Sequence, residues 1–196
     1  MSGVGWAELE RSLAAHEPAP VADVVGSRAA VALLVRETTG RLELLFIRRA
    51  EHEGDPWSGH VGFPGGRAEP GEGDLLATAI RETLEETAID LSRDGALLGR
   101  LDEVRAMARG RPVDLAISPF VFRLRQPADG APSHEVVSLH WLPLATLLDP
   151  ASRSTVDYVH EDAHLTLPCL RVGGLVIWGL TYRMFDNLRH VLGEDR

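Results

Sequence analysis

Three neighbouring glutamates are the side chains of this sequence best suited to chemistry. Glu82, Glu85 and Glu86 lie within residues 74–87, where apolar residues recur at helical spacing. At 100° per residue, the three carboxylates fall on one side of a helix. Glu82 and Glu86 form a like-charge pair at helical spacing, which costs a few tenths of a kcal/mol unless a cation offsets it. Oxygen ligands without His or Cys favour Mg²⁺ or Mn²⁺ over Zn²⁺.

The residues flanking these glutamates favour the same chemistry. Arg81 can brace a glutamate through a bidentate ion pair. Before the helix, Pro64-Gly65-Gly66 predicts a tight turn whose backbone N–H groups could meet a phosphate oxygen. Taken singly, an acidic helix face is usually just solvated, and two glycines usually form an ordinary turn. Their order along the chain, glycine loop then clustered carboxylates, favours a metal site that handles phosphate.

Hydrophobic periodicity and turn residues predict the elements that position these groups. Leu76, Ile80 and Leu84 form an apolar stripe that is expected to face the core, opposite the carboxylates. Strands and helices are mixed without regular alternation, which indicates an α/β or α+β fold with a mixed sheet. Helices are expected at 4–15, 74–87, 144–148 and 180–192, and strands at 29–35, 42–48, 97–104, 116–124, 135–141, 165–172 and 175–178.

Length and charge restrict the classes of function. With 196 residues, 44% hydrophobic and 25% charged, the chain is an ordinary globular sequence. Its 29 acidic and 20 basic residues give a net charge of −9. Such a chain repels phosphate at long range, so nucleic acid and anionic membranes are not expected as partners. A phosphate substrate would need cations as well.

The chain is expected to have one main domain. Residues 1–25 are predicted to form an N-terminal helix and linker, and residues 26–192 the main domain. The N-terminal helix, with Trp6, could cap the core or contact a second copy in a homodimer. The lone cysteine, Cys169, excludes an intramolecular disulfide and is expected to be buried. No segment resembles a signal peptide or is long enough to span a membrane, so a cytoplasmic protein is expected.

The glutamate segment resembles the Nudix box, a glycine followed by an acidic residue and then R-E-U-x-E-E-x-G-U, where U is apolar. The matching residues are Arg81, Glu82, Glu85, Glu86 and Ile89. Thr83 stands where an apolar residue is usual, and Ala88 replaces the glycine. The upstream glutamate of the common box would fall on Gly73, whereas Glu72 lies one residue away.

Further matches resemble the coenzyme A pyrophosphatase branch of this family. They extend from residue 29 to residue 188 and include Phe63-Pro64-Gly65-Gly66 and the run 178–183. Upstream, residues 45–50 also resemble the branch, although its extra arginine near Gly54 is missing. The resemblance implies an α/β/α sandwich around a mixed sheet. It also implies hydrolysis of a small nucleotide-type substrate with Mg²⁺ or Mn²⁺, coenzyme A or acyl-coenzyme A being favoured.

The resemblance also implies roles for individual residues. Glu85 and Glu86 would be the principal metal ligands, and Glu82 a metal ligand or the group that accepts a proton from water. Arg81 would orient Glu82 or its neighbour. Glu135, from outside the helix, is a second candidate for base or ligand.

Substrate-binding residues are expected directly before the long loop at 50–70 and within it. Arg48 and Arg49 could pair with a substrate phosphate, and Gly65 and Gly66 could approach one. Two alternatives remain open: another Nudix substrate, such as ADP-ribose, a dinucleotide or a nucleoside triphosphate, or a non-catalytic nucleotide-binding module. The aromatic residues Trp57 and His60 are candidates for the substrate mouth, whereas Trp178 and Phe185 are expected in the core.

Overall fold

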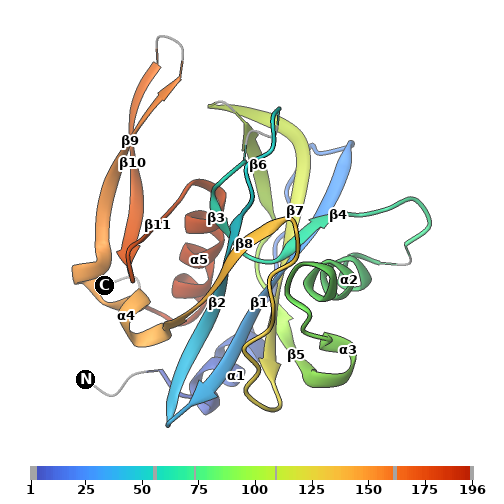
Figure 1. Cartoon of the computed structure of the whole chain (residues 1–196), viewed down its shortest axis with the longest axis vertical. Helices are drawn as coiled ribbons and strands as arrows, with labels where there is room; N and C mark the ends of the chain where they lie inside the picture. Colours follow the sequence, from blue (N-terminus) through green and yellow to red (C-terminus); the bar gives the residue numbers. More distant parts are fainter. Residues whose placement is uncertain (1–3, 55–56, 73, 109, 161–162, 195–196) are drawn as a thin grey trace.

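A mixed β-sheet with helices on both faces forms the body of the molecule (Figure 1). The computed structural model describes residues 4–54, 57–72, 74–108, 110–160 and 163–194. The central strand β1 (Ser27–Thr38) pairs antiparallel with β2 (Arg41–Arg49) and parallel with β7 (Arg111–Leu124). The other strands of this sheet are β3 (Val61–Gly62), β4 (Gly65–Arg67), β5 (Gly95–Arg100), β6 (Val104–Ala108) and β8 (Val136–Pro143).

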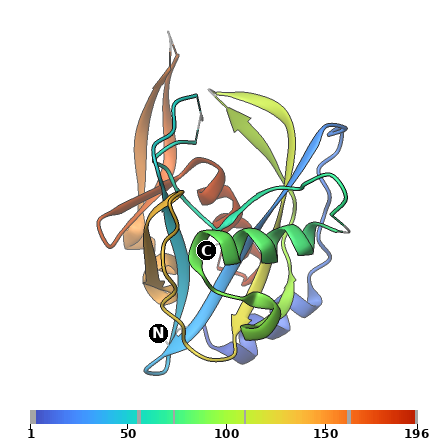
Figure 2. The same cartoon turned by 45° about the vertical axis from the view of Figure 1, so that its right-hand side comes forward.

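Two cores lie on opposite faces of the sheet because side chains of β1 alternate between them. Ala30, Ala32 and Leu34 of β1 pack under α2 (Leu75–Thr87), with α3 (Leu91–Asp94) beside it (Figure 2). The alternate residues of β1 pack into a larger core on the other face. That core also contains residues of α1 (Trp6–Ala15), α4 (Leu144–Leu148) and α5 (Gly179–Val191). The predicted α/β/α sandwich with a mixed sheet is confirmed.

A second, three-stranded sheet lies on the same side as α4 and α5. It consists of β9 (Arg153–His160), β10 (Ala163–Val172) and β11 (Leu175–Trp178), and the one-turn helix η1 (Pro150–Ser152) leads into it. The predicted hairpin turn at Gly173 and Gly174 is confirmed, with φ angles of 59° and 79°. Both angles lie in the left-handed region, which a tight two-residue turn requires and glycine readily adopts.

Some sequence-based boundaries are wrong. The single strand expected at 97–104 is two strands, because β5 ends at Arg100 and β6 begins at Val104. Strand β9, helix α3 and the short strands β3 and β4 were not predicted. In the sequence of β9, RSTVDYVH, polar residues predominate and the apolar residues stand singly, so there is no apolar run to identify a strand. Figure 1 shows that β9 and β10 extend beyond the body of the molecule, where less apolar surface needs burial.

The predicted apolar stripe of α2 is confirmed only in part. Leu76 and Ile80 pack against the smaller core as partly buried side chains, whereas Leu84 is 46% exposed. The face turned toward the sheet instead carries small residues, among them Ala79 and Thr83, both fully buried. The Thr83 hydroxyl donates to the Ala79 carbonyl at 2.7 Å, which satisfies its polar group inside the core. Small side chains here let the helix lie close to β1 and bring its carboxylates to the sheet.

The N-terminal segment is packed onto the main domain. Leu9 and Leu13 of α1 are 0% and 3% exposed in the larger core. The linker is bound as well, because the Ala19 N–H donates to Asp102 at 2.8 Å and the Val21 N–H to Glu103 at 3.0 Å. The helix therefore caps the core, and the domain boundary at residue 25 and the homodimer stay predictions. Within the described ranges, the helices are all too short or too polar to cross a bilayer.

Candidate active site

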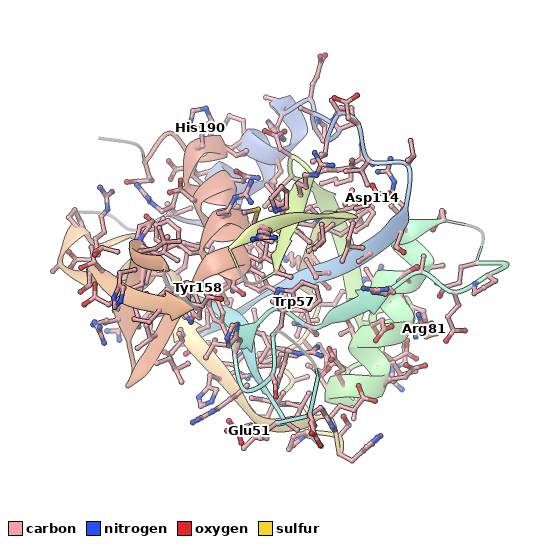
Figure 3. All side chains as sticks on the ribbon, turned by 90° about the horizontal axis from the view of Figure 1, so that it is seen from above. Glu51, Trp57, Arg81, Asp114, Tyr158 and His190 are labelled. Carbon is pink, nitrogen blue, oxygen red and sulfur yellow. The ribbon has the colours of Figure 1, made fainter. Side chains whose placement is uncertain are left out.

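A cavity of about 470 Å³ opens where β1 and β2 diverge. The two strands pair only from Val35 to Thr38 of β1, and β4 takes the place of β2 beside Ala29 to Val31. In the view of Figure 3, Trp57 lies between Tyr158 on β9 and Arg81 on α2. The charged residues lining the cavity are Arg49, Arg67, Glu82, Glu86 and Glu135.

Glu86 is the most deeply buried carboxylate of the cavity. Its side chain is 2% exposed, and its Oε2 accepts a hydrogen bond from the Gly65 N–H at 2.8 Å. A guanidinium nitrogen of Arg49 lies 3.7 Å from Oε1. Burial raises the pKa of Glu86 to about 7, although the Gly65 N–H and Arg49 oppose the rise. The charges of Glu82 and Glu135 raise it further, so the site concentrates negative charge that lacks a full counterion.

Glu82 lies one turn earlier and faces Gly66. Burial raises its pKa, Arg81 opposes the rise, and the charges of Glu85 and Glu135 add to it. A Cβ at Gly66 would overlap the Glu82 carboxylate. The glycine at this position therefore makes room for the carboxylate beside the β-strand.

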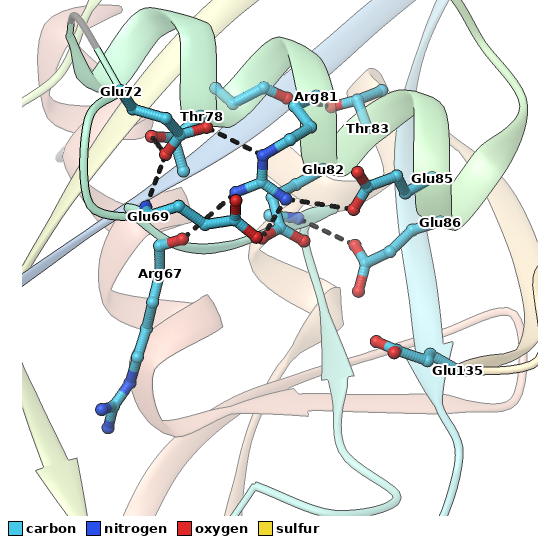
Figure 4. Close-up of polar contacts among 12 residues, drawn as sticks. Arg67, Glu69, Glu72, Thr78, Arg81, Glu82, Thr83, Glu85, Glu86 and Glu135 are labelled. Atoms are coloured by element: carbon cyan, nitrogen blue, oxygen red, sulfur yellow. Dashed lines mark hydrogen bonds and ion pairs between the residues drawn. The ribbon is translucent and has the colours of Figure 1, made fainter.

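Arg81 holds the carboxylates of three glutamates (Figure 4). Its guanidinium lies 2.8 Å from Glu72, 2.9 Å from Glu82 and 3.0 Å from Glu85. Glu72 also accepts hydrogen bonds from the Thr78 hydroxyl and the Glu69 N–H. The bond from Arg81, followed by these two, lowers the pKa of Glu72 to about 2.

Glu72 does not line the cavity. It is the partner of Arg81, although the spacing of the common Nudix box assigns the upstream glutamate to Gly73. Gly73 lies outside the described residues. The spacing from Glu72 to Arg81 is one residue longer than in the common box, and the two side chains form an ion pair across it.

We expect Glu72→Gln to lower kcat/KM by about tenfold, because Arg81 loses its charged anchor and Glu82 loses its fixed orientation. The thermal midpoint should fall by a few degrees. Asp90→Asn is a matched control, since Asp90 caps α3 away from the cavity. Steady-state kinetics and thermal unfolding of both variants check this. Equal activity losses in the two variants would contradict a positioning role for Glu72.

The other predicted residues divide into two groups. Arg49 and Glu135 line the cavity, whereas Arg48 does not. Arg48 is exposed and faces His140, whose pKa is lowered by burial and by the Arg48 charge. The pairing of β2 with β8 is irregular between Arg48 and Arg49, and only Arg49 of the two lines the cavity, so a joint role at a substrate phosphate stays a prediction. Glu85, 57% exposed, lies at the rim and does not line the cavity.

The aromatic residues of the cavity include one that was assigned to the core. Trp57 and His60 line the cavity as expected, and so does Trp178 at the end of β11. Trp178 packs against His60 and Tyr158, with ring centroids 4.8 Å and 5.4 Å apart. Phe185 is fully buried in the core, as predicted. Apolar patterning identified Trp178 as buried because a cavity wall and a core have the same composition.

Arg67 is a cavity residue that sequence reasoning missed. It follows Gly66 directly, and its carbonyl accepts a bond from Arg81 at 3.3 Å. Its side chain is exposed and points away from the carboxylates in Figure 4. Its position next to the glycine turn was the available signal. The Gly65 N–H, expected to be free for a phosphate, is instead bonded to Glu86.

The donor set suits a hard divalent cation. Glu82, Glu86 and Glu135 bring only carboxylate oxygens to the cavity. The charge of Glu135 raises the pKa of both Glu82 and Glu86, and the charge of Glu82 raises the pKa of Glu86. A divalent cation would remove that repulsion. As the side chains stand, no three His, Cys, Asp or Glu residues of the described ranges are gathered as ligands around one point. The chemistry of these residues fits Mg²⁺ or Mn²⁺. One carboxylate oxygen of Glu82 is paired with Arg81, and one of Glu86 accepts the Gly65 N–H.

The buried charge of Glu86 should make the metal-free protein less stable as the pH rises. Its folded pKa of about 7 exceeds the ordinary value of 4.5, so the folded state binds the proton more tightly. Stability in EDTA should fall between about pH 5 and pH 7 and then level off. Chemical unfolding across this range measures the effect. Glu86→Gln should flatten the dependence, and an unchanged slope would contradict the assignment to Glu86.

Comparison with known proteins identifies the family. A family model described as NUDIX domain matches residues 26–161, more than half of the chain. The chain therefore belongs to the NUDIX domain family, as the glutamate motif and the sandwich fold indicated.

Several relatives and a solved structure are similar to this chain. The mitochondrial coenzyme A diphosphatase NUDT8 of Homo sapiens is 31% identical over 160 residues, covering 78% of this chain and 64% of the relative. The peroxisomal coenzyme A diphosphatase ndx-8 of Caenorhabditis elegans is 35% identical over 114 residues, covering 57% of this chain and 46% of the relative. The chain thus spans less than two thirds of either relative. A crystal structure of a C. elegans Ap4A hydrolase binary complex has a TM-score of 0.53 at 26% identity, covering 63% of this chain and 84% of that one.

Proposed function

We propose that this chain hydrolyses the diphosphate of coenzyme A or an acyl-coenzyme A, releasing 3′,5′-ADP and 4′-phosphopantetheine or its acyl form. The observation that carries the proposal is the cavity that Glu82, Glu86 and Glu135 line together with Arg49. Similarity to two coenzyme A diphosphatases supports this substrate. An acidic chain needs such a site to hold an anionic substrate at all.

The residues have separate roles in the proposed reaction. Glu82 and Glu86, with Glu85 at the rim, would hold Mg²⁺ or Mn²⁺. When bound, these ions supply charge neutralisation for the diphosphate and lower the pKa of a water molecule. Arg81 keeps the Glu82 carboxylate in one orientation. Glu135 is exposed enough to accept a proton from the attacking water, and Arg49 is placed to pair with a diphosphate oxygen.

A dinucleoside polyphosphate is the second candidate substrate. The structural similarity to an Ap4A hydrolase supports it. A non-catalytic module is disfavoured because the residues of the box, Arg81, Glu82, Glu85 and Glu86, are intact. Cytoplasmic location also stays a prediction, since the named relatives are mitochondrial and peroxisomal.

A turnover assay tests the proposal. Purified protein with Mg²⁺ or Mn²⁺ would be given coenzyme A, ADP-ribose, Ap4A and nucleoside triphosphates, and the products separated by chromatography. Higher kcat/KM for coenzyme A, with 3′,5′-ADP as product, supports the proposed substrate. Preference for Ap4A supports the second candidate. Binding of these nucleotides without turnover would contradict both.

A further inference from the structure

The cavity has two chemically different halves. One half carries the carboxylates together with Arg49 and Arg67. The other half is apolar and faces α5 and β7. Its residues are Val31, Val61, Leu115, Ile117, Leu180 and Met184. The two halves form one continuous cavity. A diphosphate held in the charged half carries one substituent at each end, and each substituent extends either into the apolar half or out of the cavity.

The apolar half offers few groups to a polar ligand. The Thr181 hydroxyl donates to the Val61 carbonyl at 2.8 Å, and the indole N–H of Trp57 donates to the Met107 carbonyl at 3.1 Å. A hydroxyl or phosphate entering this half would lose its water without gaining equal partners, which costs several kcal/mol for a charged group. An apolar group would instead gain from burial.

The two ends of coenzyme A differ in what stands next to the diphosphate. On the pantetheine end, a dimethyl-substituted carbon lies close to the phosphate ester. On the nucleotide end, the next group is a ribose that carries a doubly charged phosphate. The pantetheine end thus places two methyl groups and one hydroxyl beside the diphosphate, whereas the nucleotide end places a ribose and a charged phosphate there, so the pantetheine end loses less on entering the apolar half.

We propose, on the basis of the proposed function, that the pantetheine arm enters the apolar half of the cavity. The ribose 3′-phosphate then stays near Arg67, whose exposed side chain points away from the carboxylates in Figure 4. This arrangement also disfavours ADP-ribose, because each end of that molecule brings ribose hydroxyls to the diphosphate. The apolar half thus selects the substrate by the group beside the reacting phosphate.

Product inhibition by each half of the substrate distinguishes the two orientations. Ile117 lies on β7 in the apolar half and is 7% exposed, so Ile117→Phe fills part of that half. Val25→Phe adds the same side chain at a position that is 94% exposed and serves as the control. Inhibition constants for 4′-phosphopantetheine and for 3′,5′-ADP would be measured with coenzyme A as substrate.

We expect Ile117→Phe to weaken inhibition by 4′-phosphopantetheine at least about tenfold, the scale of a misfit in an apolar pocket. Inhibition by 3′,5′-ADP should stay within about twofold, and Val25→Phe should change neither constant. Weakened inhibition by 3′,5′-ADP alone would reverse the orientation and overturn the proposal. Unchanged inhibition by both products would remove the apolar half from the binding site.

A second variant guards against a folding defect. Leu180 is half-buried in the cavity wall, and Leu180→Gln introduces a polar group at similar volume. It should weaken 4′-phosphopantetheine selectively as well, while the thermal midpoint stays close to that of the parent. Loss of inhibition by 3′,5′-ADP instead would again reverse the orientation. Absence of coenzyme A turnover in the parent protein overturns the proposed function itself, and this is measured first.

Discussion

Glu86→Gln should lower kcat/KM at least about 100-fold with Mg²⁺ or Mn²⁺, because a catalytic metal contributes several kcal/mol to the barrier. Glu86 is the carboxylate at the centre of the site, 2% exposed, with the Gly65 N–H and Arg49 on either side. A glutamine keeps the shape and one acceptor oxygen but cannot balance the charge of a divalent cation. Steady-state kinetics on coenzyme A, and metal binding by calorimetry, measure the loss.

The same substitution should stabilise the metal-free protein. The pKa of Glu86 rises from 4.5 to about 7, so at pH 8 its ionised form opposes folding by up to about 3 kcal/mol. Removing the charge removes that penalty. Glu8→Gln, on an exposed face of α1, controls for the change in net charge and should alter neither property. An active Glu86→Gln, or one that is less stable in EDTA, would exclude Glu86 as the central buried carboxylate.

The parts of the fold that depend on local sequence were predictable. Helix α4 has the expected bounds, and the glycine pair at 173–174 forms the expected turn, because neighbouring residues determine both. The apolar run in β1 identified a buried central strand. The boundary between β5 and β6 was not predictable in this way. The boundary depends on how β5 and β6 each pair with the distant strand β7.

The site shows the same division. The spacing of Glu82, Glu85 and Glu86 on one helix is a local property and was found from the sequence. Which face of α2 meets the sheet is not local, since it depends on how closely Ala79 and Thr83 allow the helix to approach. That packing sends Glu86 inward to Gly65, 21 residues earlier, and leaves Glu85 at the rim. Periodicity alone therefore found the carboxylates but could not rank them.

Substitution by alanine should have different effects at the adjacent glycines Gly65 and Gly66: at Gly66 it should lower activity, and at Gly65 it should lower stability. In Gly66→Ala, the added methyl group meets the Glu82 carboxylate, the mobile end of a side chain, which can move aside. The fold should persist while kcat/KM falls about 100-fold, because a displaced catalytic group costs rate steeply. In Gly65→Ala, the methyl group meets the Ala30 carbonyl and the Val31 Cα, and φ is 151°. Backbone cannot move aside, so about 3 kcal/mol of stability should be lost.

A double-mutant cycle separates displacement of Glu82 from any other effect of Gly66→Ala. In a Glu82→Gln background, the carboxylate that the methyl group displaces is already inactive, so Gly66→Ala should lower kcat/KM by less than about threefold. Thermal unfolding of Gly66→Ala should match the parent within about 2 °C. Full additivity of the two substitutions would mean that Gly66 acts through something other than Glu82. In that case, the close approach of β4 to α2 at Gly66 would not determine the orientation of the Glu82 carboxylate.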